Sequence, residues 1–170
     1  MSNNYVTDKN KEYAFFWGGV FSQWYPCKFE IDGIVFNCAE QYMMHSKALM
    51  FNDTNAAYDI LTTSDPKIQK SLGRRVKNFD KYAWDKVAQR IVYDGNIAKF
   101  SQNPKLLKVM MDTGDLKFVE ASPYDTIWGI GLNAVQAQQM SPSQWKGLNW
   151  LGLALTDVKS ALRAEAQLNR

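Results

Sequence analysis

Apolar residues alternate in short runs near the start of the chain and recur every three or four positions through its middle. Residues 15–18 predict a short buried strand. Apolar residues alternate over 27–31 and 34–36 on either side of Asp32-Gly33, which is typical of an antiparallel hairpin. Helical spacing with start and stop residues then predicts helices over about 38–51, 53–62, 66–73, 80–100 and 104–113. A strand at 118–121, an irregular segment at 126–149 and a last helix at about 150–166 complete the pattern.

These elements predict a mainly α (α+β) fold, a single helical domain with a small antiparallel β-sheet. The 170 residues are enough for one domain with a proper core. Residues 1–12 are polar and are expected to form a flexible N-terminus, so the domain spans 13–168. The sequence contains no repeat, linker or low-complexity segment.

Composition narrows the function classes. Aromatic residues make up 14% of the chain, more than a core needs, so some rings are expected to line a concave surface. The net charge of +3 tolerates a phosphorylated substrate but is too weak to indicate duplex DNA binding. No apolar run approaches the roughly 20 residues that span a bilayer. The polar start is no signal peptide, and the two cysteines favour a reducing, cytoplasmic setting. A single His without a Cys/His cluster argues against a zinc site, so no metal is expected.

The segment 39–48 carries the most distinctive chemistry. On a helix, seven residues make about two turns, so Glu40, Met44 and Lys47 share one stripe. A carboxylate and an amine at this spacing suit a site between them, because surface ion pairs prefer a spacing of four. Two structural alternatives remain open. Asn37 and Glu40 have capping-box spacing, and Lys47 can be a snorkelling lysine with its amine in water. In a pocket, desolvation would instead lower the lysine pKa and free the amine for Schiff-base chemistry.

Further candidates lie in the second half of the chain. Glu120 shares a strand face with Phe118, so it is expected to point inward if Phe118 is buried. Asp125 precedes Trp128 and Gly129 and is either an Asx-turn residue or an acid beside an aromatic platform. Asn149 fits a helix N-cap. Arg74, within the densest basic cluster, is either a phosphate contact or part of a solvated face. His45 is assigned a structural role.

The order of these features along the chain is more diagnostic of a protein family than any single feature. Along the chain the motifs are Phe21-Ser22-x-x-Tyr25-Pro26, Phe36-x-x-Ala39-Glu40-Gln41-Tyr42, Lys47-Ala48, Gly73-Arg74, Val119-Glu120-Ala121-Ser122, Asp125-x-x-Trp128-Gly129 and Gly147-x-Asn149-x-Leu151-Gly152. This series resembles the NADAR family of YbiA-like N-glycosidases from about residue 15 to 163. Two departures stand out: the usual Ser-Asn-Phe-Tyr-Pro is Ser22-Gln23-Trp24-Tyr25-Pro26 here, and Lys159 replaces an Arg of the final helix. Gln23 bears on substrate detail more than on the reaction.

The resemblance implies hydrolysis of the C–N bond between a ribose C1 and a base or amine, without a cofactor or metal. The implied substrates are ADP-ribosylated guanine, including single-stranded nucleic acid, or phosphorylated ribosylamino-pyrimidine intermediates of riboflavin synthesis. We expect Lys47 to capture C1 as a Schiff base, and Glu40, Asp125 and Glu120 to handle protons, hydroxyls and orientation. A rival route has a glutamate activate water directly, and a non-catalytic ADP-ribose or NAD-binding module is the other alternative. The implied substrate-binding residues are Trp17, Ser22, Phe36, Tyr42, Arg74, Lys99, Trp128, Gly129 and Asn149.

Overall fold

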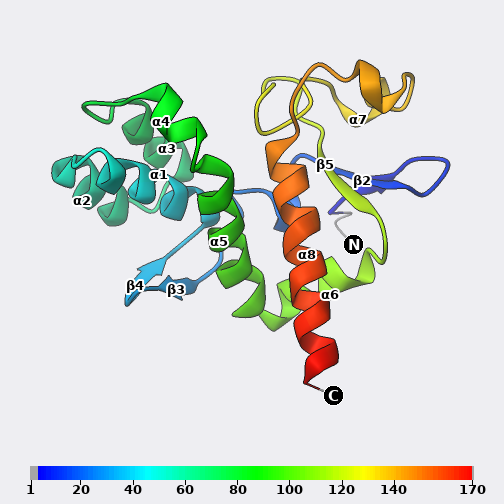
Figure 1. Ribbon diagram of the computed structural model, residues 1–170, viewed down its shortest axis with the longest axis horizontal. Coiled ribbons are helices and arrows are strands. Elements are labelled where there is room, and N and C mark those ends of the chain that lie inside the picture. The colour runs from blue at the N-terminus through cyan, green and yellow to red at the C-terminus, as the bar shows by residue number, and fades with distance from the viewer. Residues whose placement is uncertain (1–3, 170) are drawn as a thin grey trace. The chain divides into compact units, whose positions relative to one another are not determined.

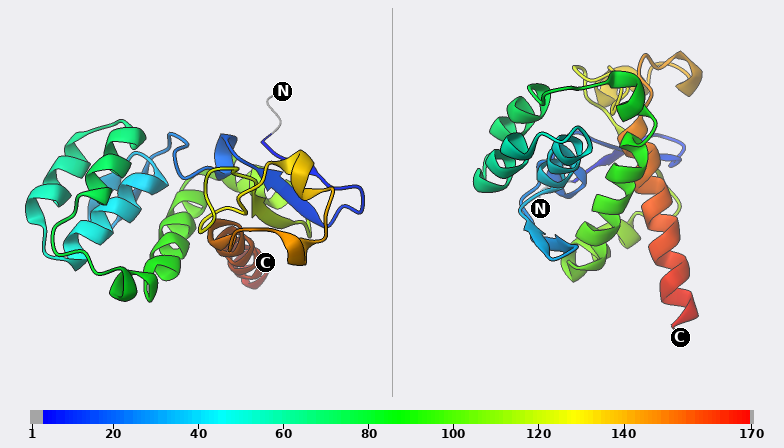
Figure 2. Two further views of the ribbon diagram at one scale, coloured as in Figure 1. Left: turned by 90° about the horizontal axis from the view of Figure 1, so that it is seen from above. Right: turned by 60° about the vertical axis from the view of Figure 1, so that its left-hand side comes forward.

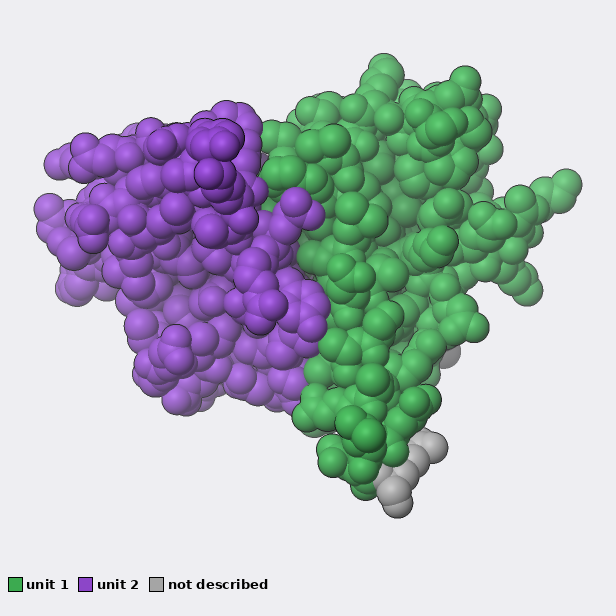
Figure 3. Space-filling model, viewed as in Figure 1, with its two compact units in different colours: residues 1–22, 104–170 green, residues 23–103 purple. Residues whose placement is uncertain are grey.

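The computed structural model describes residues 4–169. These residues divide into two compact units, which Figure 3 distinguishes by colour. Unit 1 comprises residues 1–22 and 104–170, and unit 2 comprises residues 23–103. Unit 2 is therefore an insertion between two segments that fold together. Each unit has its own elements and core and is described separately.

Unit 2 begins with a hairpin and continues as a group of helices (Figure 1). The hairpin pairs β3 (Phe29–Ile31) with β4 (Ile34–Phe36) antiparallel, as predicted. Asp32 and Gly33 both have positive φ, 52° and 79°, which this two-residue turn requires. The helices are α1 (Ala39–Met50), α2 (Thr54–Thr62), α3 (Pro66–Arg74), α4 (Lys81–Asp85) and α5 (Ala88–Ser101).

Helix α1 packs against α2, α3 and α5. Two glycines on its partners permit close approach. A Cβ placed on Gly73 of α3 would lie 1.9 Å from Sδ of Met44, and one on Gly95 of α5 would lie 2.6 Å from Cδ1 of Tyr42. Real Cβ atoms do not come this close to other atoms, so the backbones of α3 and α5 can contact α1 only because these positions lack side chains.

The single helix expected over about 80–100 is wrong. Asp80 caps α4 by accepting hydrogen bonds from the N–H groups of Tyr82 and Ala83, but the helix closes after one turn. The N–H of Val87 bonds to the carbonyl of Trp84, a three-residue spacing that tightens the chain. Val87 itself has φ −120°, outside the helical range, and α5 starts after it.

Unit 1 holds a three-stranded sheet in the order β1 (Val6–Thr7), β2 (Tyr13–Phe16), β5 (Lys117–Glu120). The expected small antiparallel sheet is present in the hairpin, but the sheet of unit 1 is mixed: β1–β2 is antiparallel and β2 pairs with β5 in parallel. Strand β1 also places part of the supposedly flexible N-terminal segment in the sheet. The remaining elements are η1 (Gly19–Phe21), α6 (Pro104–Asp112), α7 (Ala134–Ala137), η2 (Pro142–Gln144) and α8 (Trp150–Leu168).

The two faces of the β2–β5 pair have different partners within unit 1. Phe15 and Val119 point to one face and pack in a cluster with Ile130 and Leu132. Phe118 occupies the other face, where it contacts Phe21 at a ring-centroid distance of 4.6 Å. Helix α8 packs against β5, and the two are labelled side by side in Figure 1. Figure 2 shows this helix, coloured orange to red, from two further directions. Elements from both ends of the chain therefore build this core.

The observed architecture confirms the mainly helical α+β fold class. Among the described residues, no helix combines the length and apolarity that a membrane crossing requires.

Candidate functional site

Helix α1 carries the two residues at the centre of the candidate site in unit 2. The helix starts at Ala39 with Cys38 as its N-cap, so Glu40 is the second helical residue and Gln41 the third. The backbone N–H of Asn37 therefore bonds to Oε1 of Gln41, at 2.8 Å, rather than to Glu40. The predicted Asn37–Glu40 capping box is wrong because the helix begins one residue later than that box requires. Glu40 is thereby left out of this capping role.

Glu40 is buried, with 7% of its surface exposed, at the N-terminus of α1. Its backbone N–H donates to the carbonyl of Gln23 at 2.9 Å. The positive end of the helix dipole favours an ionised carboxylate in the first turn. The site thus holds an acidic group that is shielded from bulk water and fixed by the first turn of α1.

Lys47 is half-buried in the last turn of the same helix. Its Nζ lies 4.2 Å from the ring centroid of Phe79 and 5.8 Å from that of Trp84. Burial lowers the pKa of Lys47; the negative charge of Glu40 opposes this change and the positive charge of Arg74 adds to it. These surroundings agree with a partly desolvated lysine.

Helix α3 brings basic residues to the same unit. Arg74 is exposed, and its positive charge lowers the pKa of Lys47. Lys67, Lys70 and Arg74 are spaced three and four residues apart on one side of α3, which contains no acidic residue. Three exposed cations on other helices, by contrast, pair with an acid four residues on: Lys81 with Asp85, Arg90 with Asp94 and Lys108 with Asp112. The α3 stripe therefore remains a candidate for phosphate contacts.

Lys99 does not share this exposure. It is fully buried in α5, and its Nζ lies 5.1 Å from the ring centroid of Phe100. Burial lowers its pKa to about 8. The predicted phosphate contact at Lys99 is wrong for this conformation, because its side chain faces the interior of unit 2.

Phe36 and Tyr42 belong to the aromatic core beside α1. Phe36 is 2% exposed and packs on Phe29 and on Tyr42, with ring centroids 5.7 and 5.1 Å apart. Tyr42 is half-buried over Gly95. A buried ring with contacts on several sides has no free face for a base, so the structure corrects the expectation that Phe36 encloses the substrate.

The side chains of Gln23 and Asn96 form a hydrogen-bonded pair that is linked to Glu40 through the backbone of Gln23. Nδ2 of Asn96 donates to Oε1 of Gln23 at 2.9 Å, and the carbonyl of Gln23 accepts the N–H of Glu40. Nε2 of Gln23 and Oδ1 of Asn96 are buried, and neither has a hydrogen-bond partner among the residues that the structure describes. Such atoms are costly unless something binds them. The Gln23–Asn96 pair thus leaves one buried donor and one buried acceptor close to the backbone of Glu40.

Unit 1 holds the other predicted residues. Glu120 is half-buried at the end of β5, on the face that also carries the buried Phe118, as the strand pattern predicted. Asn149 lies at the N-cap position of α8, but its side chain makes no cap. Instead its Oδ1 accepts the N–H of Glu120 and its Nδ2 donates to the carbonyl of Phe118. Asn149 therefore closes the free edge of β5, and its amide is fully engaged there.

Asp125 organises the loop that follows β5. Its Oδ1 accepts the N–H groups of Ile127 and Trp128, each at 2.8 Å, as in an Asx-turn. Gly129 is buried, and an added Cβ would lie 2.9 Å from the carbonyl oxygen of Glu120. Trp128 packs edge-on against Trp150 with ring centroids 5.5 Å apart. This loop is thus a tightly packed support with an acidic residue, and its glycine serves chain packing.

Two further predicted residues lie at the surface or at the edge of unit 1. Trp17 is 56% exposed and lies 5.7 Å from the ring of Tyr124, which is 84% exposed. Ser22 is half-buried, and its N–H donates to the carbonyl of Gly19. Trp17 keeps the exposed ring surface that base stacking requires.

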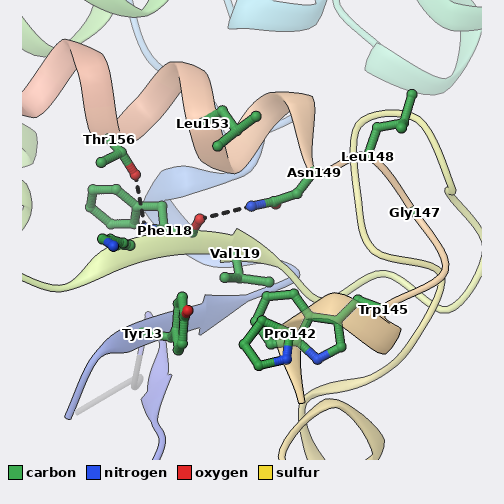
Figure 4. A pocket seen from close by; sticks show the side chains of 11 residues that line it. Tyr13, Phe118, Val119, Pro142, Trp145, Gly147, Leu148, Asn149, Leu153 and Thr156 are labelled. Atoms are coloured by element: carbon green, nitrogen blue, oxygen red, sulfur yellow. Dashed lines mark hydrogen bonds between the residues drawn. The ribbon is translucent and has the colours of Figure 1, made fainter. Parts of the chain in front are cut away.

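Unit 1 also contains a cavity of about 320 Å³ (Figure 4). Its aromatic lining residues include Tyr13, Phe118 and Trp145. Asn149 and Thr156 also line it, and both side chains hydrogen-bond to the backbone of β5. Of the predicted site residues only Asn149 lines it, and Lys47, Glu40, Glu120 and Asp125 do not. The cavity is therefore distinct from the predicted catalytic residues. In the described chain no group of three or more His, Cys, Asp or Glu side chains is arranged to hold a metal ion.

Sequence reasoning missed Phe79 and the Gln23–Asn96 pair. Phe79 lies in a short connection with no periodic pattern. Asn96 lies inside a helix, where a polar residue is normally predicted to face solvent, but it is fully buried. The only signal for Gln23 was its departure from the family motif.

The pattern that defines the NADAR domain family matches residues 15–163. The chain belongs to the NADAR domain family. A protein of Acanthamoeba polyphaga mimivirus named as an N-glycosidase is 45% identical over 90% of this chain and 96% of its own length. The N-glycosidase YbiA of Escherichia coli is 26% identical over 86% of this chain and 83% of its own. The NMR structure of E. coli YbiA matches with a TM-score of 0.77 over 98% of this chain and 92% of that chain; at 23% identity this likeness concerns the fold.

Proposed function

We propose that this protein is an N-glycosidase that hydrolyses the C–N bond between a ribose C1 and a base or amine. The observation that carries the proposal is the half-buried Lys47, whose pKa burial lowers, on the same helix as the buried Glu40. A desolvated amine is the nucleophile that attacks a sugar aldehyde or imine carbon. The relatives are named N-glycosidases, which supports cleavage of an N-glycosyl bond.

The reaction we propose uses Lys47 as a covalent catalyst. Ring opening of the substrate gives an imine between C1 and the departing nitrogen. The neutral Nζ adds to C1, the C–N bond to the base breaks, and the base leaves as an amine that has gained a proton. The resulting Lys47–C1 imine adds water, which releases the sugar aldehyde and restores the amine. One water is consumed, and the products are the free amine and the sugar.

We assign the proton transfers beside Lys47 to Glu40. Glu40 is buried, and its negative charge is near enough to raise the pKa of Lys47. A positioned carboxylate typically contributes 10²–10⁴-fold in rate. The unpaired donor of Gln23 and acceptor of Asn96 match a ribose hydroxyl, which both accepts and donates. Glu120 and Asp125 in unit 1 remain proposed acid–base groups, to be tested by their own variants.

The proposed substrates are ADP-ribosylated guanine, in nucleotides or single-stranded nucleic acid, and phosphorylated ribosylamino-pyrimidines. The cationic stripe of α3, with Arg74 at the end that acts on Lys47, supports a phosphorylated substrate. Trp17 and Trp128 are the proposed stacking surfaces. Cys27 and Cys38 are free thiols, in keeping with a reducing, cytoplasmic setting.

The decisive experiment compares Lys47→Ala with Lys86→Ala. Lys86 is an exposed lysine whose Nζ also lies 4.2 Å from an aromatic ring, that of Tyr82, so it is a matched control. Both proteins receive an ADP-ribosylated guanine oligonucleotide and a ribosylamino-pyrimidine phosphate, and released base is measured by chromatography. Lys47→Ala should lose at least about 10²–10⁴-fold in rate and remain folded, while Lys86→Ala should match the wild type.

Trapping with borohydride during turnover separates the alternatives. Sugar fixed to Lys47 supports the imine route. Turnover without trapped sugar supports direct attack by water, with a glutamate as the base. Calorimetric binding of ADP-ribose without release of base from any substrate would establish a binding module in place of an enzyme. Wild-type turnover by Lys47→Ala contradicts the assignment of Lys47.

A further inference from the structure

The ring of Phe79 covers the amine of Lys47. The Nζ lies 4.2 Å from the centroid of this ring and 5.8 Å from that of the buried Trp84. Phe79 itself is 43% exposed.

The backbone around Phe79 is held on both sides. The N–H of Lys77 donates to Oδ2 of Asp53 at 2.9 Å, and Asp80 caps α4 immediately after the ring. Asn78 takes a left-handed conformation with φ 58°, which turns the chain between these anchors. Phe51, directly after α1, packs edge-on against Phe79 with centroids 5.4 Å apart. These contacts fix the ring in its position over Nζ.

We propose that Phe79, together with the more distant Trp84, is a catalytic residue that stabilises positive charge on the Lys47 nitrogen, first as the ammonium and then as the iminium of the covalent intermediate. This inference rests on the Schiff-base function proposed above. Aromatic faces attract cations through their quadrupole. The iminium forms when the amine adds to C1 and the departing amine takes the proton and leaves. It is consumed when water adds to C1 and the C–Nζ bond breaks.

A ring suits this role better than a second carboxylate. Lys47 must lose its proton to attack, and an additional carboxylate beside it would hold that proton strongly. The fixed charges that act on Lys47 are Glu40 on α1 and Arg74 on α3, and they oppose each other. The aromatic contact favours the cation by only about 2- to 30-fold in proton affinity. Burial remains the dominant effect, so the amine is still available for attack.

The test measures the pH midpoint of Lys47 labelling by ribose 5-phosphate with cyanoborohydride, read by peptide mass spectrometry. Phe79→Leu should move the midpoint about 0.3–1.5 units to lower pH, because the ammonium loses its cation–π partner. Phe79→Trp should restore the midpoint. Tyr82→Leu is the control, since Tyr82 is an exposed ring at the same 4.2 Å from another lysine, Lys86. With an active substrate, the alkaline limb of turnover should move in the same direction, as the iminium loses its proton more easily.

The outcomes separate this inference from the function beneath it. If wild-type Lys47 takes no label and turnover traps no sugar, the Schiff-base mechanism fails. If wild-type Lys47 is labelled and the midpoints of wild type and Phe79→Leu agree, the role of Phe79 is overturned while the mechanism stands. A fall in labelling at every pH without a moved midpoint shows a packing role and also overturns the inference, because only charge stabilisation moves the midpoint.

Discussion

Lys159 allows a quantitative test of a buried charge in unit 1. Only 3% of this residue is exposed. Its Nζ donates to Oγ1 of Thr113 at 3.0 Å and to the carbonyl of Leu116, and it lies 4.8 Å from the ring centroid of Phe118. Burial lowers its pKa from 10.5 to about 8; the charge of Arg163 adds to this and that of Asp115 opposes it. The folded protein therefore bears a penalty whenever Lys159 is protonated.

The sign of the pH dependence follows from where the protons bind. Between about pH 8 and 10.5 the unfolded chain holds the Lys159 proton and the folded protein has released it. Because the unfolded state binds more protons in this range, the free energy of unfolding rises with pH. One pKa unit corresponds to about 1.4 kcal/mol, so the full rise due to Lys159 is about 3 kcal/mol. The contribution is complete above 10.5 and is lost as the pH falls through about 8.

Lys159→Met removes this contribution, and Lys159→Arg retains a charge that does not titrate in the range. Urea unfolding of the three proteins at intervals from pH 7 to 10.5 gives the free energies of unfolding. Lys99, with a pKa of about 8, and the raised pKa values of Cys38 and Tyr42 also shape each curve. They are common to all three proteins and cancel in the differences. The wild type should gain about 3 kcal/mol relative to both variants as the pH rises.

Parallel curves for wild type and Lys159→Met would refute the reasoning, because they would show that the folded protein releases the Lys159 proton at an ordinary pKa. At pH 7 the Met variant is stabilised because it no longer buries a charge. It is destabilised because the carbonyl of Leu116 loses its hydrogen-bond donor. We expect these two effects to offset in part, since an unsatisfied buried acceptor costs about 1–3 kcal/mol.

Two further predictions concern packing and the sheet edge. Gly73→Val should destabilise the protein by about 1–3 kcal/mol through its clash with Met44, lowering Tm by several degrees and reducing turnover, while Ser71→Val on the exposed side of α3 should do neither. An unchanged Tm would show that Met44 moves aside without cost. Asn149→Ala should cost about 2–4 kcal/mol in urea unfolding, because it leaves the N–H of Glu120 and the carbonyl of Phe118 unpaired. Asn149→Asp keeps the acceptor but sets a carboxylate oxygen against the carbonyl of Phe118, so it should not restore stability, and wild-type stability of this variant would contradict this account.

Local patterns in the sequence account for most of the observed elements. The hairpin at Asp32-Gly33 was predictable because a two-residue turn with positive φ has few sequence solutions. Helix α1 and the common stripe of Glu40 and Lys47 follow from helical periodicity alone. The inward face of Glu120 followed from the alternation of β5. Each of these depends on neighbours within a few residues, where the printed sequence holds all the information.

Contacts between distant segments could not be predicted in this way. The parallel pairing of β2 with β5 joins strands on either side of the whole of unit 2, and no local signal selects a partner at that separation. The same limit applies to Phe79 over Lys47, to Asn149 on the edge of β5 and to the burial of Lys99.

The sequence by itself determined most of the helices, the hairpin turn and the chemical types available along α1, since these depend on backbone preference and periodic burial. Only the tertiary structure decided which charged groups lose water and which aromatic rings approach them. Desolvation and cation–π attraction depend on atoms that packing brings together from separate elements, and in the mechanism we propose these two effects set the reactivity of the Lys47 amine.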